Sequence, residues 1–151
     1  MDIKALVGSG DSIMLFTLPF AVLGVVLNLV FPTFFDVGGP SHTLTVVSVA
    51  LVTFGGAIWA WSVVLILTKV PGRKLITSGP YAVVKHPLYT GVALLVLPWA
   101  GFLFNTWIGV LLGIAMYVGS RIYAPREERI LSEAFGTGWD EYCGRVKIPW
   151  L

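Results

Sequence analysis

The chain has 151 residues, of which 56% are hydrophobic and only 12% are charged. A soluble domain is typically about 25% charged, so this composition excludes an ordinary water-soluble protein and predicts that most of the surface faces lipid. The net charge of +2, without a basic run interleaved with aromatic residues, argues against nucleic acid as a partner. The single cysteine, Cys143, excludes an intrachain disulfide, and with only two distant histidines we expect no metal site.

The first uncharged stretch, residues 12–35, predicts a transmembrane helix. A bilayer core takes about 20 helical residues to cross, and the apolar part of a signal peptide is only about 7–15 residues long. We therefore interpret this stretch as a retained span. Pro19 and Gly24 inside it are tolerated in membranes when neighbouring helices satisfy the backbone.

A second span is predicted over residues 44–68, after a turn at residues 36–40 that is rich in glycine and proline. Trp59 and Trp61 lie towards its far end. Tryptophan is enriched where a helix leaves the hydrocarbon core, so both fit a position near the interface.

The third apolar stretch contains no charged residue between His86 and Ser120. Roughly 35 residues would form a helix of about 52 Å, which is too long for a core of about 30 Å. We therefore predict a tight helical hairpin with arms at residues 87–102 and 106–123, turning within residues 98–105. Gly109 and Gly113 are spaced to let two helices approach closely.

Four spans place both termini on the same side of the membrane. In this topology all basic residues fall on that side, and the other side carries only Asp36. The basic residues are Lys4, Lys69, Arg73, Lys74, Lys85, Arg121, Arg126, Arg129, Arg145 and Lys147. The positive-inside rule then predicts cytoplasmic termini. A single long third span would divide the basic residues between the two sides, so the charges favour the hairpin independently.

The expected fold is therefore all-α: a polytopic membrane bundle of about four transmembrane helices, followed by a cytoplasmic helical segment. We expect residues 1–151 to form one membrane-embedded domain. No ionisable residue lies inside a predicted span, which argues against an ion transporter.

One polar segment of the basic side runs over residues 73–91. Ser78-Gly79-Pro80 is typical of a turn, and His86-Pro87 is typical of a helix entry because proline favours the first helical position. The unpaired N–H groups of such an entry suit a carboxylate or phosphate. Alternatively, His86 is only an interfacial cap residue, and Tyr81 and Tyr89 are interface aromatics.

The other polar segment begins at Arg121 and contains Glu127 and Glu128. On a helical wheel, Glu127 lies at the centre of an apolar face and Glu128 lies at its edge. The residues that share the face of Glu127 are Tyr123, Ile130, Leu131 and Ala134. A carboxylate there needs a cation or hydrogen-bond donors. Either it forms a salt bridge to Arg121, Arg126 or Lys85, or it contacts a ligand; Pro125 can kink or restart this helix.

Residues 135–149 predict a turn and a short amphipathic helix that lies on the membrane surface or covers a site. Cys143 falls within this helix. We interpret it as a packing residue, because no second histidine is placed to activate it as a nucleophile.

Several of these residues form a recognisable combination. Residues 79–91 read G-P-Y-A-V-V-K-H-P-L-Y-T-G, and Glu127-Glu128, Phe135-Gly136, Tyr142, Val146 and Pro149 follow. This combination resembles the isoprenylcysteine carboxyl methyltransferase and phospholipid methyltransferase superfamily. The resemblance covers about the C-terminal half, whereas the N-terminal helices match only as apolar spans.

The resemblance implies a methyltransferase that uses S-adenosylmethionine, leaves S-adenosylhomocysteine, and works at the cytoplasmic membrane face. The residues it implies around the cofactor are Lys74, Leu75, Ile76, Tyr81, His86, Pro87, Tyr89, Glu127 and Glu128. Glu127, His86, Arg121 and Arg126 are the candidates for a catalytic role. The sequence has no G-x-G-x-x-G turn after a strand, so a Rossmann cofactor site is not available.

The expected partners are membrane lipids and a lipophilic methyl acceptor that enters from the bilayer. A prenylcysteine carboxylate, a phospholipid amine and a small thiol remain open as its reactive group. The sequence departs from the family at Lys85, where an arginine is usual, and at Tyr123, where carboxyl methyltransferases place an arginine against the acceptor carboxylate. Arg121 and Arg126 are the nearest replacements. The alternative function is a non-catalytic scaffold or partner-binding protein of the same fold.

Overall fold

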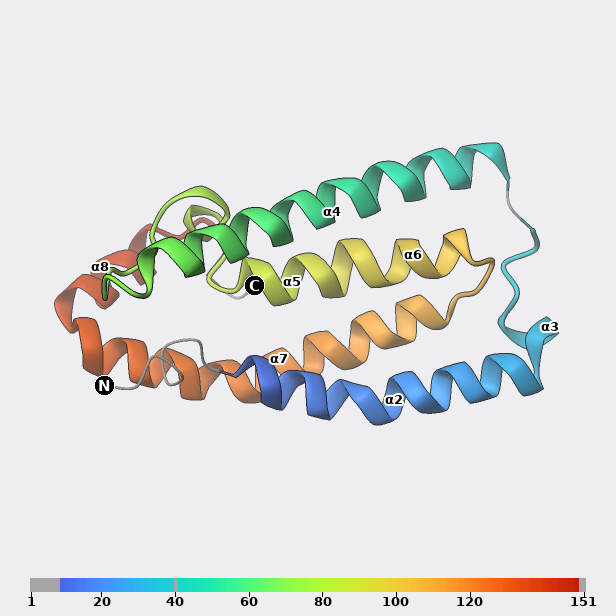
Figure 1. Cartoon of the computed structure of the whole chain (residues 1–151), viewed down its shortest axis with the longest axis horizontal. Helices are drawn as coiled ribbons and strands as arrows, with labels where there is room; N and C mark the ends of the chain where they lie inside the picture. Colours follow the sequence, from blue (N-terminus) through green and yellow to red (C-terminus); the bar gives the residue numbers. More distant parts are fainter. Residues whose placement is uncertain (1–8, 40, 150–151) are drawn as a thin grey trace.

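The computed structural model describes residues 9–39 and 41–149. Within these ranges the protein is helical, and its only β contacts are two isolated bridges. The elements are α2 (Gly10–Val30), α3 (Pro32–Phe35), α4 (His42–Lys69), the 3-10 turn η1 (Gly79–Ala82), α5 (Pro87–Gly91), the π-helical η2 (Val92–Val96), α6 (Leu97–Leu103), α7 (Ile108–Phe135) and α8 (Thr137–Arg145). The long helices run lengthwise through an elongated bundle (Figure 1).

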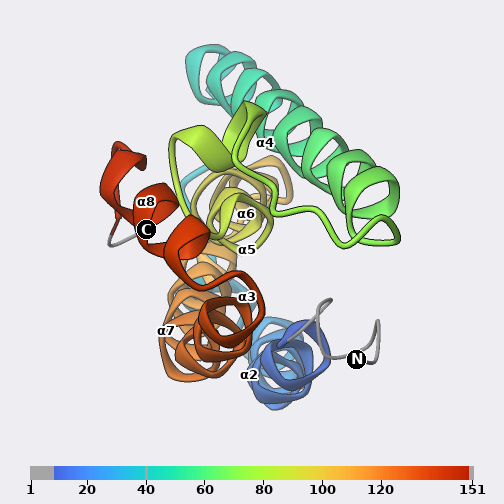
Figure 2. The same ribbon diagram turned by 90° about the vertical axis from the view of Figure 1, so that its left-hand side faces the viewer.

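The helices stand side by side in a curved row, in the order α4, α5–α6, α7 and α2 (Figures 1 and 2). Helices α2, α4 and α7 are each long and apolar enough to cross a membrane, and the uninterrupted helical run Pro87–Leu103 is a shorter apolar helix. The predicted helical membrane bundle is therefore confirmed, and the protein is an integral membrane protein.

The two N-terminal spans differ slightly from their predicted limits. Helix α2 ends at Val30, because Phe31 leaves the helical conformation and Pro32 begins the separate turn α3. Helix α4 begins at His42, where the Ser41 hydroxyl accepts a hydrogen bond from the backbone N–H of Leu44 at 3.1 Å. This is a standard N-cap, which satisfies a donor that the helix itself leaves free.

The third apolar stretch folds as the predicted hairpin, with the turn between Leu103 and Ile108. Glycines allow its arms to touch backbone to backbone. A Cβ added to Gly101 would lie 2.8 Å from the Cα of Gly109, and one added to Gly113 would overlap the carbonyl oxygen of Ala93. The close approach predicted from Gly109 and Gly113 is therefore present.

Small residues also bring α4 against the first arm of the hairpin. The buried residues of α4 are Ser48, Gly55 and Ser62, spaced seven apart. A Cβ on Gly55 would lie 2.7 Å from the Cβ of Leu95. Because seven residues are close to two helical turns, these small side chains form one stripe along which the helices meet.

Helix α7 continues through Pro125 to Phe135 without a break, so proline neither ends nor restarts it. Its first part carries no charged residue before Arg121, and the remainder carries the charges of the second polar segment. Gly136 ends the helix with a φ of 51°, a left-handed conformation that glycine adopts without strain. Helix α8 follows directly, as the predicted short amphipathic helix.

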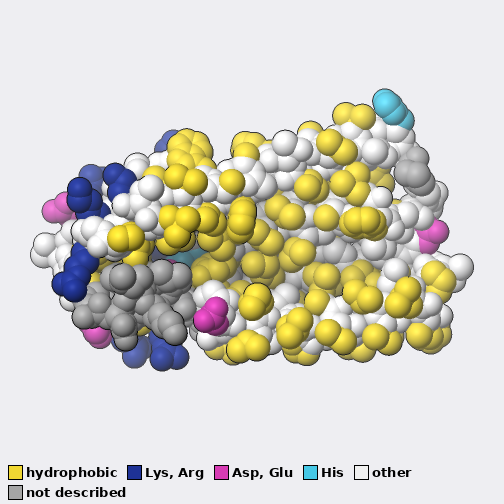
Figure 3. Space-filling model, in the orientation of Figure 1, with side chains coloured by type: hydrophobic (Ala, Val, Ile, Leu, Met, Phe, Trp, Pro, Cys, Tyr) yellow, Lys and Arg dark blue, Asp and Glu magenta, His cyan; other side chains and the backbone are white. Residues whose placement is uncertain are grey.

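The charges separate along the bundle. Lysine and arginine side chains gather at one end, and apolar side chains cover the remaining length (Figure 3). At the opposite end, the Asp36 carboxylate accepts hydrogen bonds from the backbone of Gly38 at 2.6 Å and from the Asn105 amide at 2.8 Å. These bonds tie the loop before α4 to the turn of the hairpin. Lys4 and both chain ends lie outside the described residues.

Candidate functional site

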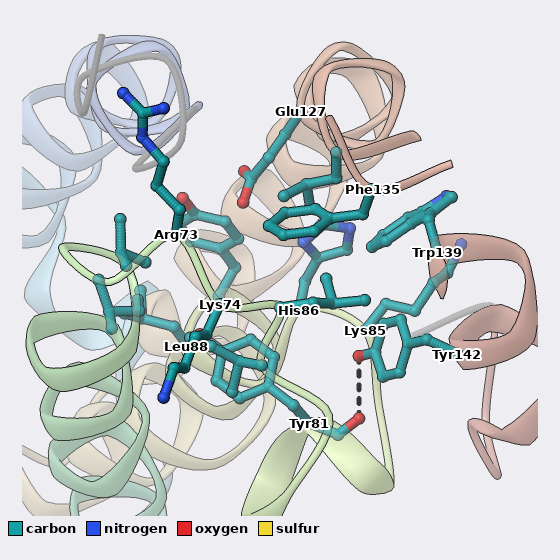
Figure 4. Close-up of a pocket in the computed structure, with 16 residues that line it drawn as sticks. Arg73, Lys74, Tyr81, Lys85, His86, Leu88, Glu127, Phe135, Trp139 and Tyr142 are labelled. Carbon is teal, nitrogen blue, oxygen red and sulfur yellow. Dashed lines mark hydrogen bonds between the residues drawn. The ribbon is translucent and has the colours of Figure 1, made fainter. Parts of the chain in front are cut away.

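A cavity opens at the basic end of the bundle, where segments distant in sequence converge (Figure 4). The space inside it is about 720 Å³, counting the part that is open to solvent. Its walls come from the end of α4, the connector before η1, the entry to α5, the charged part of α7, and α8. This is the region where the sequence placed both polar segments.

Most of the predicted cofactor residues line this one cavity. They are Lys74, Leu75, Ile76, Tyr81, His86, Tyr89 and Glu127. Pro87 and Glu128 do not line it. Pro87 is buried and faces a neighbouring apolar groove, and Glu128 contacts His86 at the start of α5. The hairpin therefore brings residues 74–89 and Glu127 together, as the proposed topology requires.

Glu128 fastens the α5 entry to α7. One oxygen, Oε1, lies 2.7 Å from the Lys85 ammonium and 3.0 Å from His86 Nε2. The His86 ring also stacks on Tyr89, with ring centroids 6.2 Å apart. His86 is therefore oriented by two neighbours. Lys85, one of the three salt-bridge partners considered for Glu127, pairs with Glu128 instead.

This arrangement predicts a loss of stability at low pH. The hydrogen bond from His86 and the contacts with Lys85 outweigh burial, and they lower the pKa of Glu128 from 4.5 to about 2. A group with a depressed pKa contributes its full stabilisation above its ordinary pKa and loses it as the pH falls towards the lowered value. We expect the melting temperature of purified protein to fall as the pH drops from about 5 to 3, and Glu128→Gln to flatten that dependence. An equally steep dependence in the variant would contradict this role.

Glu127 is the acidic side chain that points into the cavity (Figure 4). It is partly buried, and its Oε2 lies 3.4 Å from the backbone nitrogen of Ser9. Burial raises the pKa of this carboxyl group, against the lowering effects of His86 and of the Ser9 N–H. A partly buried carboxylate has lost some of its hydration. It is therefore suited to bind a ligand that carries a positive charge or hydroxyl groups.

The two candidate arginines lie away from Glu127's side of α7. Arg126 is exposed and does not line the cavity. Arg121 lies with Lys85 and Glu128 at a separate hollow behind the α5 entry. Arg73 instead reaches the cavity from the connector, with a φ of 50° that is unusual for a residue with a side chain.

Helix α8 covers one side of the cavity. Trp139 and Tyr142 line it, and the Tyr142 hydroxyl donates a hydrogen bond to the carbonyl oxygen of Tyr81 at 2.9 Å. The backbone of Ile148 continues this attachment by donating to the carbonyl of Val83 at 2.9 Å. Of the two placements predicted for α8, the structure shows the covering one.

Cys143 lies beside this attachment and packs against the cluster of Trp139, Tyr142 and Val146. Burial raises the pKa of its thiol. A raised pKa lowers the fraction of reactive thiolate, so the environment agrees with a packing role.

An apolar groove adjoins the cavity between α4 and the η1–α5 segment. Its walls include Phe54, Ile58, Trp61, Val83 and Leu94. Gly79 lies at the boundary between groove and cavity: a Cβ there would lie 3.1 Å from the Trp61 ring and 3.2 Å from Leu65. The positive φ of Gly79, 65°, and this tight contact both require glycine.

A comparison with protein families identifies the chain. The model of the isoprenylcysteine carboxyl methyltransferase (ICMT) family matches residues 43–133, which is more than half of its length. The protein belongs to the ICMT family. The resemblance found in the sequence is thereby confirmed, and family membership indicates a membrane methyltransferase. ICMT family methyltransferases generally use S-adenosylmethionine. No solved structure matches the chain.

The ICMT match begins at α4 and ends within α7, so it contains the cavity residues from Ile66 to Leu131, which are most of the lining. Several cavity residues were missing from the predicted set: Arg73, Lys85, Leu88, Leu131, Phe135, Trp139 and Tyr142, with Ile66 and Val70 of α4. The helical wheel already placed Leu131 beside Glu127, and Phe135 lies about one turn beyond Leu131. No signal in the sequence placed Trp139 or Ile66 there.

Proposed function

We propose that this protein transfers a methyl group from S-adenosylmethionine to a lipophilic acceptor at the cytoplasmic face of a membrane. The observation that carries this proposal is the convergence of Lys74–Ile76, Tyr81, His86, Tyr89 and Glu127 on one cavity beside an apolar groove. The gathering of lysine and arginine at this end supports its cytoplasmic orientation.

The residues present fit the cofactor. When bound, S-adenosylmethionine supplies an activated methyl group on a positively charged sulfur. Glu127 would accept hydrogen bonds from its ammonium or hydroxyl groups, and the cations of Arg73 and Lys74 would face its carboxylate. The aromatic faces of Tyr81 and Tyr89 are suited to a positively charged sulfur.

The apolar groove is the proposed seat of the acceptor's hydrocarbon part. It has room for a chain between α4 and α5, and Thr90 is its one polar side chain among the described residues. The segment 80–88 contributes to both groove and cavity, since Pro80, Val83 and Pro87 line the groove and Tyr81, Lys85 and His86 line the cavity. A chain lying in the groove would therefore hold a polar headgroup near the cofactor residues.

The protein itself contributes by aligning the cofactor with the acceptor and by excluding water from the cavity. Holding two reactants in a fixed geometry contributes several kcal/mol to a transfer reaction, and the covering helix α8 limits the access of water to the cavity. An ionised carboxylate or thiolate acceptor needs no base. For an amine acceptor, Glu127 or His86, which both line the cavity, would remove the proton.

The test is to incubate purified protein with isotopically labelled cofactor and a native lipid extract, then identify the methylated molecule. We expect a labelled, lipid-soluble product that is absent with Glu127→Gln. The alternative function, a non-catalytic scaffold, predicts no saturable cofactor binding and no product. That pair of results would overturn the proposal.

A further inference from the structure

The amino-terminal end of α2 contacts residues of the cavity. In the sequence it lies before residues 43–133, which the family model matches. Ser9, which precedes α2 and is only 6% exposed, makes two contacts with α7. Its backbone N–H donates to Glu127 Oε2 at 3.4 Å, and its hydroxyl donates to the carbonyl oxygen of Tyr123 at 2.9 Å. Both acceptors belong to the same turn of α7, because they are four residues apart.

The next residue approaches a second cavity residue. A Cβ added to Gly10 would lie 3.3 Å from the hydroxyl oxygen of Tyr89. Tyr89 is buried and lines the cavity beside Glu127. The start of α2 therefore limits the positions available to the Tyr89 hydroxyl. A side chain at Gly10 would press against this hydroxyl, so glycine allows it to stay where it is.

Packing along the membrane span fixes how far α2 extends towards the cavity. Ile13 is only 1% exposed. Phe16 fits against Gly119, where an added Cβ would lie 2.8 Å from its ring, and Gly24 lies against Ile108 in the same way at 3.0 Å. Because close-packed helices cannot slide without losing such contacts, the register of α2 on α7 places Ser9 at Glu127.

We propose that Ser9 and Gly10 are positioning residues for the cofactor site: they hold the Glu127 carboxylate and the Tyr89 hydroxyl in the arrangement that binds the cofactor. This inference rests on the proposed function. A glutamate side chain has several rotatable bonds, so a donor that fixes its carboxylate before binding lowers the cost of ordering it afterwards. The site would then include the N-terminal helix as well as the segment shared with the family.

The test is cofactor affinity, measured by calorimetry on full-length protein in detergent. Ser9→Ala removes the hydroxyl that anchors Ser9 to α7, and we expect the dissociation constant to rise about 2- to 10-fold, the effect of losing one hydrogen bond. Ser9→Thr keeps the hydroxyl and should restore affinity. Gly10→Ala tests the contact with Tyr89 separately and should also weaken binding.

Two controls separate positioning from general stability. Thr17→Val removes a hydroxyl that bonds only the carbonyl of Ile13 within α2, at 2.8 Å, and should leave affinity unchanged. In a Glu127→Gln background, Ser9→Ala should have little further effect, because the two residues act as one unit. A structural role alone would instead give additive losses.

The outcomes are distinguishable. Wild-type protein that binds no cofactor would overturn the proposed function and this inference with it. Wild-type binding that is matched by both Ser9→Ala and Gly10→Ala would overturn only the inference. Additive effects in the double variant would likewise assign Ser9 to stability and not to the site.

Discussion

Glu127→Gln is expected to weaken cofactor binding roughly 10- to 100-fold while leaving the protein folded. The change keeps the size of the side chain and removes its charge. Hydrogen bonds to charged groups contribute about 1.5–3 kcal/mol, which corresponds to that range of affinity. Calorimetric titration of purified protein with S-adenosylmethionine or S-adenosylhomocysteine measures the change directly.

The matched control is Glu133→Gln, which removes the same charge from an exposed position on the same helix. It should leave the affinity unchanged. An equal loss in both variants would point to the net charge of α7 rather than to the cavity, and unchanged affinity in Glu127→Gln would remove this residue from the site.

The burial of Glu127 adds a pH dependence to cofactor binding. Its pKa is raised by burial, so it becomes neutral at a higher pH than an exposed glutamate does. If the ionised form binds the cofactor, affinity should decrease as the pH is lowered towards this raised pKa. The Glu127→Gln variant should lack that part of the dependence.

Gly109→Ala is expected to disrupt the hairpin and to give the largest loss of stability among glycine-to-alanine substitutions in the described helices. A Cβ at Gly109 would overlap the carbonyl oxygen of Leu97 and lie 2.8 Å from the Cα of Gly101. Backbone atoms cannot rotate away as side chains do, so we expect a cost of about 3 kcal/mol, at the upper end of overpacking effects. Thermal unfolding in detergent and the yield of monodisperse protein are the measurements.

Gly56→Ala is the control for this change, because an added Cβ there meets no atom within 4 Å. Alanine favours helices over glycine by about 1 kcal/mol in a helix interior. Gly56→Ala should therefore leave stability unchanged or raise it slightly. Equal melting temperatures for Gly109→Ala and wild type would show that the arms do not meet as closely as described.

The membrane bundle follows from the sequence alone, because the hydrophobic stretches and the positions of the basic residues admit few topologies. The length of the third apolar stretch required a turn, and Gly109 and Gly113 marked the surface along which its arms meet. The helical periodicity of the segment after Arg121 placed Glu127 on the apolar face of its helix. These properties depend on spacing along the chain and on the thickness of a bilayer, so local information is sufficient for them.

The partners of the polar residues, by contrast, are visible only in the folded protein. Lys85 pairs with Glu128 and not with Glu127, Ser9 reaches Glu127 across 118 positions, and Trp139 and Tyr142 cover the cavity. Each of these contacts depends on the rotation and register of whole helices against one another. Rotation and register are set by close packing between helices at residues such as Gly24, Gly113 and Gly119. They cannot be predicted from the periodicity of a single segment.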